Sequence, residues 1–303
     1  MFRIRIQNKK KCIWYCSAVV SFLLFLLLLG WTNHLANTQD AQQMAGRWSE
    51  KKDVAQISCF FSSKAEVTED TIQSFEYSLK NVLQEASITE TSENPSARLW
   101  VDAYSADGKI TLVNGKNTLD ANAIGIGGDF FMFHPLKLIT GAYFSGNDLM
   151  QDYCIIDQDA AWQLFGSNDV VGMTVYIGNV PHIVTGVVQR PDSRMDKAAG
   201  LNSTVVYVSY ETLSAYGTNN GINHYEIVMP NPVDEFAYGK VKEGIGIDEK
   251  NVEIVENSRR YSLPNRIKTI LAFGTRSMNG KAIIYPYWEN LARGYEDIIA
   301  CLR

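Results

Sequence analysis

The most prominent feature of the hydrophobic pattern is an unbroken apolar run near the N-terminus. Residues 12–31 (CIWYCSAVVSFLLFLLLLGW) contain no charged side chain, and Trp14, Tyr15 and Trp31 lie near the ends of the run. A helix of this length spans about 30 Å, the thickness of a hydrocarbon core, and aromatic rings favour the membrane interface. The run therefore predicts a transmembrane helix. A cleaved signal peptide is the alternative, but no convincing small-x-small site follows the run.

The charges around this run predict how the chain is oriented. Residues 1–11 carry five basic side chains and no acidic one, and basic flanks stay on the cytoplasmic side. We therefore expect a cytoplasmic tail at 1–11 and a single-pass protein of the cell membrane whose main domain is extracytoplasmic. The formal net charge is −5 despite the basic tail, so the remainder is acidic. An acidic surface repels polyanions, and nucleic acid is not an expected partner.

Beyond the polar residues 33–53, alternating and helical patterns predict a first mixed unit. A strand is expected at 54–61, and a helix follows Thr68 with apolar residues at three- and four-residue spacing. Strands are expected at 97–105 and 109–113, joined by a turn at the intervening Ala-Asp-Gly. These elements form a β-α-β-β unit.

A strand, a helix and a strand recur at 224–230, 234–242 and 251–257. The stretch between the two units is richer in strands, with a hairpin predicted around Gly178–Asn179 and a polar loop at 190–203.

These patterns predict an α+β fold: one N-terminal transmembrane helix followed by a two-part mixed α/β extracytoplasmic domain. The core domain is expected at 45–260, with 54–120 and 220–260 forming one part and 123–215 forming an inserted β-rich module. Residues 264–303 are predicted to be an amphipathic juxtamembrane segment. Its apolar face is expected to contain Trp288, Leu291, Ile298 and Leu302.

The stretch GGDFFMF begins like the signature of cyclic-dinucleotide synthases. Such enzymes hold Mg²⁺ with acidic residues, but Phe130 stands where the next carboxylate would be needed. We interpret Gly127 and Gly128 as a tight turn and Asp129 as the N-cap of a short helix.

The histidines show no metal-binding spacing. His34, His134, His182 and His224 are each isolated, without an H-x-x-x-H or H-x-x-E pair. His134, in an apolar setting before a proline, is interpreted as a partly buried histidine with a backbone partner.

Acidic residues and cysteines offer two further candidates. Asp152, Asp157 and Asp159 form an acidic cluster, but the glycine-bearing spacing of a calcium loop is absent, and Asp157 is interpreted as a cap or turn residue. Cys59 and Cys154 are predicted to be buried thiols, with a disulfide between them as the alternative.

Motifs for nucleophilic or phosphate chemistry are missing from the sequence. There is no G-x-S-x-G elbow and no P-loop. We predict no catalytic, cofactor-binding or metal-ligating residues, no cofactor and no enzymatic activity.

An ordered series of motifs within residues 127–188 resembles the MacB/FtsX-type ABC transporter permeases. A Phe-Phe helix is followed by a G-aromatic-F segment, an A-x-x-L-F-G helix, a G-x-x-V hairpin and a V-x-G-V-V strand. The matching positions are Gly141, Tyr143, Phe144, Ala161, Leu164, Phe165, Gly166, Gly172, Val175, Val184, Gly186, Val187 and Val188.

The resemblance implies a MacB-like periplasmic core domain that works with a separate cytoplasmic P-loop ATPase. A second permease subunit or an envelope protein would be a further partner. In such permeases the ATPase cycle moves the external domain, which acts on cargo or envelope partners. Family members carry three more membrane helices after this domain, and these are absent from this sequence, which implies a permease subunit or a fragment of one. The alternative is a single-pass extracytoplasmic binding module that acts without an ATPase.

Overall fold

The computed structural model describes residues 2–49, 53–89, 98–272 and 282–302. Its α-helices are α1 (Phe2–Asn37), α2 (Met44–Trp48), α3 (Glu69–Glu85), α4 (Phe130–Phe133), α5 (Gln158–Phe165), α6 (Arg194–Ala199), α7 (Tyr210–Tyr216), α8 (Phe236–Gly244), α9 (Leu263–Leu271) and α10 (Tyr287–Leu302). Its strands are β1 (Val54–Phe61), β2 (Val101–Asn114), β3 (Asn117–Gly128), β4 (Lys137–Gly141), β5 (Tyr153–Asp157), β6 (Thr174–Ile177), β7 (Val180–Gln189), β8 (Val205–Ser209), β9 (Thr218–Asn219), β10 (His224–Pro230) and β11 (Val252–Glu256).

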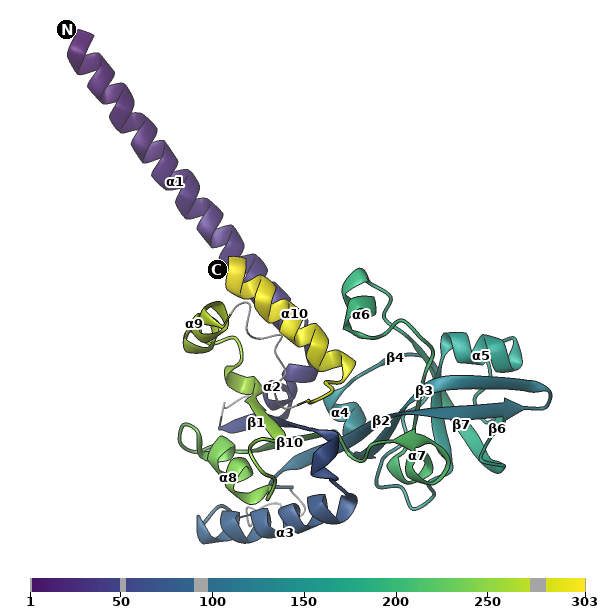
Figure 1. Cartoon of the computed structure of the whole chain (residues 1–303). Helices are drawn as coiled ribbons and strands as arrows, with labels where there is room; N and C mark the ends of the chain where they lie inside the picture. The colour runs from purple at the N-terminus through teal and green to yellow at the C-terminus, as the bar shows by residue number, and fades with distance from the viewer. Residues whose placement is uncertain (1, 50–52, 90–97, 273–281, 303) are drawn as a thin grey trace.

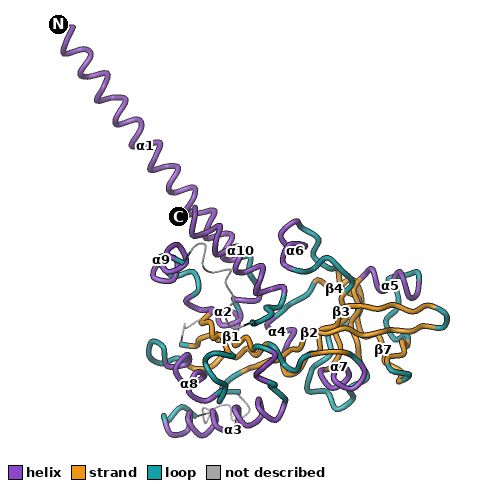
Figure 2. Tube along the Cα trace, in the orientation of Figure 1, coloured by secondary structure: helices purple, strands orange, loops and turns teal. Residues whose placement is uncertain are grey.

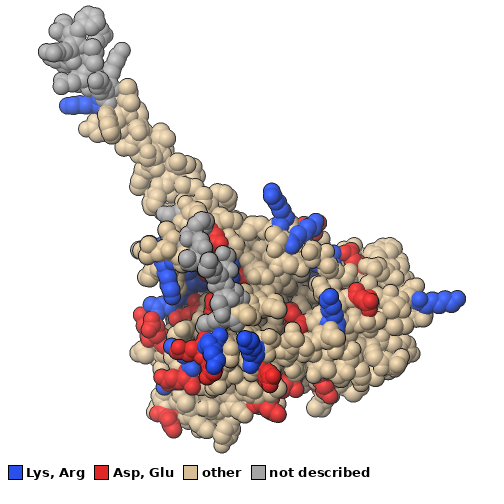
Figure 3. Space-filling model, in the orientation of Figure 1, with Lys and Arg blue, Asp and Glu red and all other residues tan. Residues whose placement is uncertain are grey.

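Helix α1 projects away from the rest of the molecule (Figure 1). Residues Lys11–Asn37 form a 27-residue stretch that is long and apolar enough to cross a membrane, and the most apolar part of it is not buried. Figure 3 shows no acidic or basic side chain along the middle of α1, whereas both kinds are frequent on the domain below it. A long apolar surface without charge is the surface that lipid favours.

In the described residues the strands form one mixed sheet in the order β11-β1-β10-β2-β3-β8-β5-β7-β4. Two strands lie outside this linear order: β6 pairs with β2 and β7, and β9 pairs with β2. Most neighbours are antiparallel, but β3–β8 and β5–β7 are parallel. The predicted class, an apolar N-terminal helix followed by a mixed α/β domain, is confirmed. Figure 2 shows the long β2–β3 hairpin extending along the domain, from the part of β2 that pairs with β10 to the part that pairs with β6.

Three groups of buried apolar side chains hold the domain together. Helices α3 and α8 cover one face of the β11-β1-β10-β2 end. Helices α2, α4 and α10 contribute side chains to a second core on the opposite face. Helices α5 and α7 close a third core at the β5–β8 end. Burial of these apolar faces at about 25 cal/mol per Å² is the main favourable contribution to folding.

The turn predicted between 97–105 and 109–113 is wrong, because β2 runs unbroken from Val101 to Asn114. Tertiary contacts override the local turn signal there. The side-chain amide of Asn223 donates to Asp107 at 2.8 Å, and an added Cβ at Gly108 would lie 2.3 Å from the carbonyl oxygen of Thr218. Gly108 therefore allows β9 to approach β2.

The glycines at 127 and 128 end strand β3 and do not form the tight turn expected from the sequence. An added Cβ at Gly127 would lie 2.0 Å from the ring of Tyr104. Gly128 has a φ of 64°, and a Cβ added there would lie 2.6 Å from the carbonyl oxygen of Asp102. Both glycines are needed for close approach to β2.

Other local predictions have mixed outcomes. The hairpin around Gly178–Asn179 is confirmed, and both residues have positive φ, as a type I′ turn requires. The polar loop predicted at 190–203 instead contains α6, whose start is capped by the Ser193 hydroxyl accepting from Asp196 N.

Candidate functional site

The last described helix, α10, docks onto the domain through a buried tryptophan. Trp288 is 4% exposed. Its ring centroid lies 4.2 Å from that of His134, 5.3 Å from that of His224 and 5.6 Å from that of Phe130. Since His134 and Phe130 belong to the α4 segment and His224 begins β10, Trp288 joins α10 to two separate parts of the chain.

A buried ion pair lies beside this tryptophan. The Arg260 guanidinium donates to both oxygens of Glu289, from Nη1 at 2.7 Å and from Nη2 at 2.8 Å, and the two side chains are 2% and 1% exposed. Arg260 Nε also donates to Glu296 at 2.6 Å. Burial alone would lower the pKa of Arg260, but the Glu289 carboxylate raises it, so the guanidinium stays charged.

The network extends from α10 to the edge strand β11. Arg293 Nε donates to Glu289 at 2.6 Å, and its Nη2 donates to Glu253 at 2.5 Å. The Tyr285 hydroxyl also donates to Glu253, at 2.5 Å, and the Arg293 guanidinium lies 3.9 Å from the centre of the Tyr285 ring. We call Trp288, Glu289 and Arg293, with the partners described above, the α10 junction.

Helix α10 also contacts α6 and the apolar helix α1. Asn290 Nδ2 donates to the carbonyl oxygen of Ala199, the last residue of α6, at 3.1 Å. The end of α10 lies beside the end of α1 (Figure 1). Helix α10 is thus in contact with β11, with the α4 segment, with α6 and with the apolar helix.

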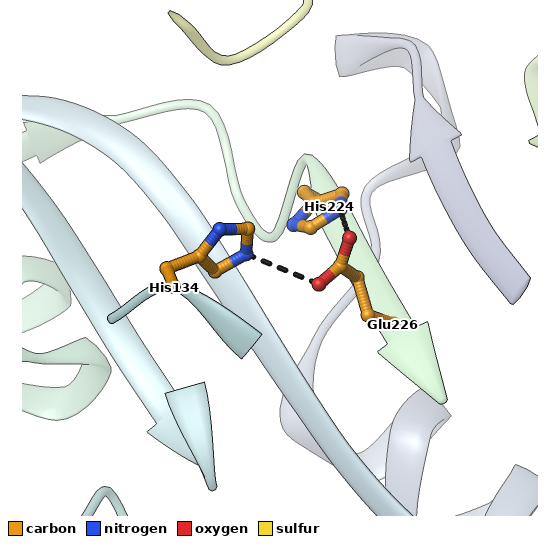
Figure 4. A group of neighbouring side chains, drawn as sticks. All are labelled: His134, His224 and Glu226. Atoms are coloured by element: carbon orange, nitrogen blue, oxygen red, sulfur yellow. Dashed lines mark ion pairs between the residues drawn. The ribbon is translucent and has the colours of Figure 1, made fainter. Parts of the chain in front are cut away.

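Three titratable side chains meet beneath Trp288. His134 Nε2 lies 3.1 Å from Glu226 Oε2, and His224 Nε2 lies 3.2 Å from Glu226 Oε1 (Figure 4). The side chains are 3%, 2% and 1% exposed, in the order His134, His224 and Glu226. We call these residues the histidine–glutamate cluster.

The two histidines, isolated in the sequence, are therefore neighbours in the fold. His134 was expected to be partly buried with a backbone partner, but it is fully buried and its ring faces the Glu226 carboxylate. Ninety residues separate His134 from His224, so no spacing rule could pair them. His224 and Glu226 are two apart on strand β10 and must share a face, and that was the only local signal.

Electrostatics in the cluster favour an ionised carboxylate. Burial would raise the pKa of Glu226, but His134 and His224 hold it well below its usual range. Burial lowers the pKa of His134, and the neighbouring carboxylate opposes this only in part. The Ser58 hydroxyl donates to Glu226 Oε1 at 2.7 Å, and Asn257 Nδ2 donates to Ser58 Oγ at 2.7 Å. This chain of hydrogen bonds connects the cluster to Asn257, which accepts from Arg260 of the α10 junction.

The aspartates singled out by the sequence have structural partners. Asp157 caps α5 by accepting from Ala160 N at 2.8 Å, as expected, and it also pairs with Arg190 at 2.5 Å. Arg190 additionally pairs with Asp159. Asp152 precedes β5, so the strand separates it from the other two.

Asp129 occupies the N-cap position of α4, but the expected side-chain cap is wrong: its carboxylate accepts no hydrogen bond from the helix and pairs with Arg98 at 2.6 Å. The remaining histidines also lie apart from the cluster. His182 is buried, with Nδ1 3.0 Å from Val180 O and Nε2 3.1 Å from Thr212 Oγ1, and His34 is exposed on α1.

Cys59 and Cys154 are both free and fully buried, as expected. They lie in different apolar cores, those of α3 and α5. Burial raises the pKa of the Cys154 thiol to about 12.

Comparison with known proteins gives partial matches. Two proteins described as macrolide export ATP-binding/permease protein MacB, from Chromobacterium violaceum and Pasteurella multocida, are 32% and 30% identical over 99 and 98 residues. Each match covers 32% of this chain but only 15% and 14% of the relative. The chain thus matches a small portion of these longer proteins.

Two solved structures overlap more of the chain at lower similarity. The extracellular domain of the noncanonic ABC-type transporter YknZ from Gram-positive bacteria is 17% identical, with a TM-score of 0.42 over 66% of this chain and 99% of that one. The periplasmic region of MacB from Actinobacillus actinomycetemcomitans is 19% identical, with a TM-score of 0.43 over 72% of this chain and 92% of that one. Such low TM-scores add nothing to the assignment.

The assignment rests on the sequence model of one family, the MacB-like periplasmic core domain, which matches residues 21–254. The match covers most of the chain, and it includes the motif series between 127 and 188. The chain therefore belongs to the MacB-like periplasmic core domain family.

Proposed function

We propose that this chain is the membrane-anchored external part of a MacB/FtsX-type ABC permease, and that it acts mechanically and not as an enzyme. Residues 1–11 lie in the cytoplasm, 12–31 cross the cell membrane, 45–260 form the extracytoplasmic core, and 264–303 return toward the membrane. Within the core, 54–120 with 220–260 and the inserted 123–215 are the two moving parts.

The observation that carries this proposal is the α10 junction. A helix that transmits motion must be firmly attached to the domain that it moves. Helix α10 is attached to the domain by a buried tryptophan, a bidentate buried ion pair and a contact with α6. It also lies beside the end of α1. A shift of α10 against α1 would therefore be passed to strand β11, to the α4 segment and to α6.

The energy source is assigned to a separate cytoplasmic P-loop ATPase. The names of the MacB relatives combine ATP binding with permease function. The residues of this sequence contain no P-loop motif, and the proposal therefore places ATP hydrolysis on a separate subunit. A second permease subunit or an envelope protein would be a further partner, acting on the external domain.

Affinity purification of the full chain from its native membranes tests the partner. We expect an ATP-binding subunit to co-purify with the wild-type chain and with Glu211→Gln, a control at an exposed position on α7. Repeated preparations without any ATP-binding protein would overturn the proposal and favour the single-pass binding module.

Cysteine labelling in intact cells tests the orientation separately. In a background where Cys12, Cys16 and Cys301 are replaced by serine, a membrane-impermeant maleimide should label Asp192→Cys on the exposed segment before α6. Lys11→Cys should be labelled only after the cells are opened. The reverse pattern would show that the external domain is in the cytoplasm.

A further inference from the structure

The histidine–glutamate cluster has a feature that ion pairing alone does not explain. The three side chains are at most 3% exposed, yet His134 Nε2, His224 Nε2 and Glu226 Oε2 make no hydrogen bond of acceptable geometry within the described part of the chain. A buried polar atom without a hydrogen bond costs about 1–3 kcal/mol. Three such atoms facing one another indicate a shared missing partner.

We propose that His134, His224 and Glu226 form a structural Zn²⁺ site. The ligating atoms of the three residues all lie within 4.8 Å of one another. In a tetrahedral site with bonds of about 2.0–2.1 Å, neighbouring ligand atoms are about 3.3 Å apart. The observed Nε2–Oε separations of 3.1 and 3.2 Å are close to this value.

The donor set suits zinc. Two imidazoles and a carboxylate are common zinc ligands, and a carboxylate bound through both oxygens would give four donors in a distorted tetrahedron.

Hydrogen bonds around the cluster orient the ligands from outside. Ser58 Oγ donates to Glu226 Oε1, and Ser105 Oγ lies 3.4 Å from His224 Nδ1, which leaves Nε2 of that ring directed at the centre. Metal-binding histidines typically have such a partner on the second ring nitrogen. The ring of His134 is fixed between Phe130, at 4.6 Å, and Trp288, at 4.2 Å.

The site is suited to a structural metal and not to a catalytic one. Trp288 covers it, and the low exposure of the ligands leaves no path for a substrate. The positive charge of Arg47 acts on His134. Arg47 is exposed, however, and its Nη2 donates to the carbonyl oxygens of Met132 and Phe133. Water screens that charge. A bound Zn²⁺ would tie β10 to the α4 segment directly beneath α10.

Metal titration of the full chain tests the site. The protein is purified in detergent with a tag that contains no histidine, stripped with a chelator and titrated with Co²⁺, whose visible absorption reports four-coordinate geometry. We expect one Co²⁺ per chain, displaced by one Zn²⁺. A folded chain that binds less than about one tenth of an equivalent would overturn the proposal.

Substitution of the proposed ligands tests which residues bind the metal. His224→Gln and Glu226→Gln should each weaken Zn²⁺ binding at least about 100-fold, and Ser58→Ala, which removes the hydroxyl that donates to Glu226, about 10-fold. His34→Gln, at the exposed histidine on α1, should bind like wild type. If the ligand variants do not fold, Ser58→Ala decides: affinity equal to that of wild type would refute the site.

Fluorescence provides a readout that needs no ligand variant. Because Trp288 touches His134, Co²⁺ should quench part of the tryptophan emission of the wild-type chain. Trp288→Phe should lose that part and keep the stoichiometry of one. Quenching that is identical in Trp288→Phe would place the metal elsewhere.

Discussion

The attachment of α10 can be tested by removing one charge from its buried ion pair. Glu289→Gln keeps the shape of the side chain but leaves the Arg260 guanidinium, which is 2% exposed, without its bidentate carboxylate. Removing one partner of a buried pair costs about 3–5 kcal/mol. Arg260 retains Glu296, and Arg293 retains Glu253, so the lower end of this range, about 3 kcal/mol, is expected.

The loss should be local, because α10 contacts the domain through its own side chains and adds no strand to the sheet. Hydrogen exchange on the full chain measures this. A change of about 3 kcal/mol corresponds to exchange on the order of 100-fold faster in the amides of α10. The amides of α3, on the opposite face, should be unchanged. Glu211→Gln, at an exposed position on α7, controls for the loss of one negative charge.

A double variant separates the ion pair from simple packing. Arg260→Met combined with Glu289→Met replaces both charges by apolar side chains of similar length, and such replacements are often neutral. Exchange in α10 should then return to within about 1 kcal/mol of wild type. Unchanged exchange in Glu289→Gln, or equal acceleration in α3 and α10, would refute the reasoning.

Three further predictions concern the domain itself. Burial, reinforced by the nearby carboxylate of Asp102, raises the pKa of Glu76 from 4.5 to about 8. Between these pH values the native chain holds a proton that the unfolded chain has lost. The free energy of unfolding should therefore fall as pH rises from about 4.5 to about 8. Urea titrations should show a smaller fall of this free energy in Glu76→Gln than in the wild type. Gly128→Ala should cost more stability than Gly166→Ala, since both have positive φ but only at Gly128 would the added Cβ meet backbone, the Asp102 carbonyl at 2.6 Å; equal melting temperatures would contradict this. A thiol reagent should modify Cys59 only after unfolding, because the thiol is fully buried and burial raises its pKa; rapid modification of the native chain would count against the described core.

Patterns that depend on neighbours in the sequence predicted much of the fold. The apolar run at 12–31, the hairpin around Gly178–Asn179 and the cap at Asp157 all rest on local chemistry, and the structure contains an apolar helix, a hairpin and a cap there. The turn expected within β2 failed because Asn223 and β9, more than 100 residues away, satisfy the residues that looked like turn formers.

The α10 junction shows that local sequence patterns also fail to predict which residues of a helix are buried. An apolar face containing Trp288, Leu291 and Ile298 was expected, but the buried positions include the charged Glu289, while Leu291 and Ile298 are half-buried. A glutamate is placed on the polar face of a helix by any hydropathy rule. It is buried here because Arg260, before α9, meets it inside the fold, and no pattern within α10 could reveal that partner.

The buried ion pair of Arg260 and Glu289 also indicates what the α10 junction does. An apolar α10 face would hold the domain about as strongly, since burying Arg260 and Glu289 costs desolvation that their attraction only offsets. An apolar helix, however, can shift by a turn and pack again, whereas a bidentate pair beside an aromatic ring fits at one position only. A helix that transmits motion must keep one fixed position against the domain that it moves. On this argument the double methionine variant should remain folded and still bind its ATPase, yet lose movement of the external domain during the ATPase cycle. A spectroscopic distance between α6 and α1, recorded with and without nucleotide, would measure that loss, and movement equal to that of the wild type would show that packing alone is sufficient.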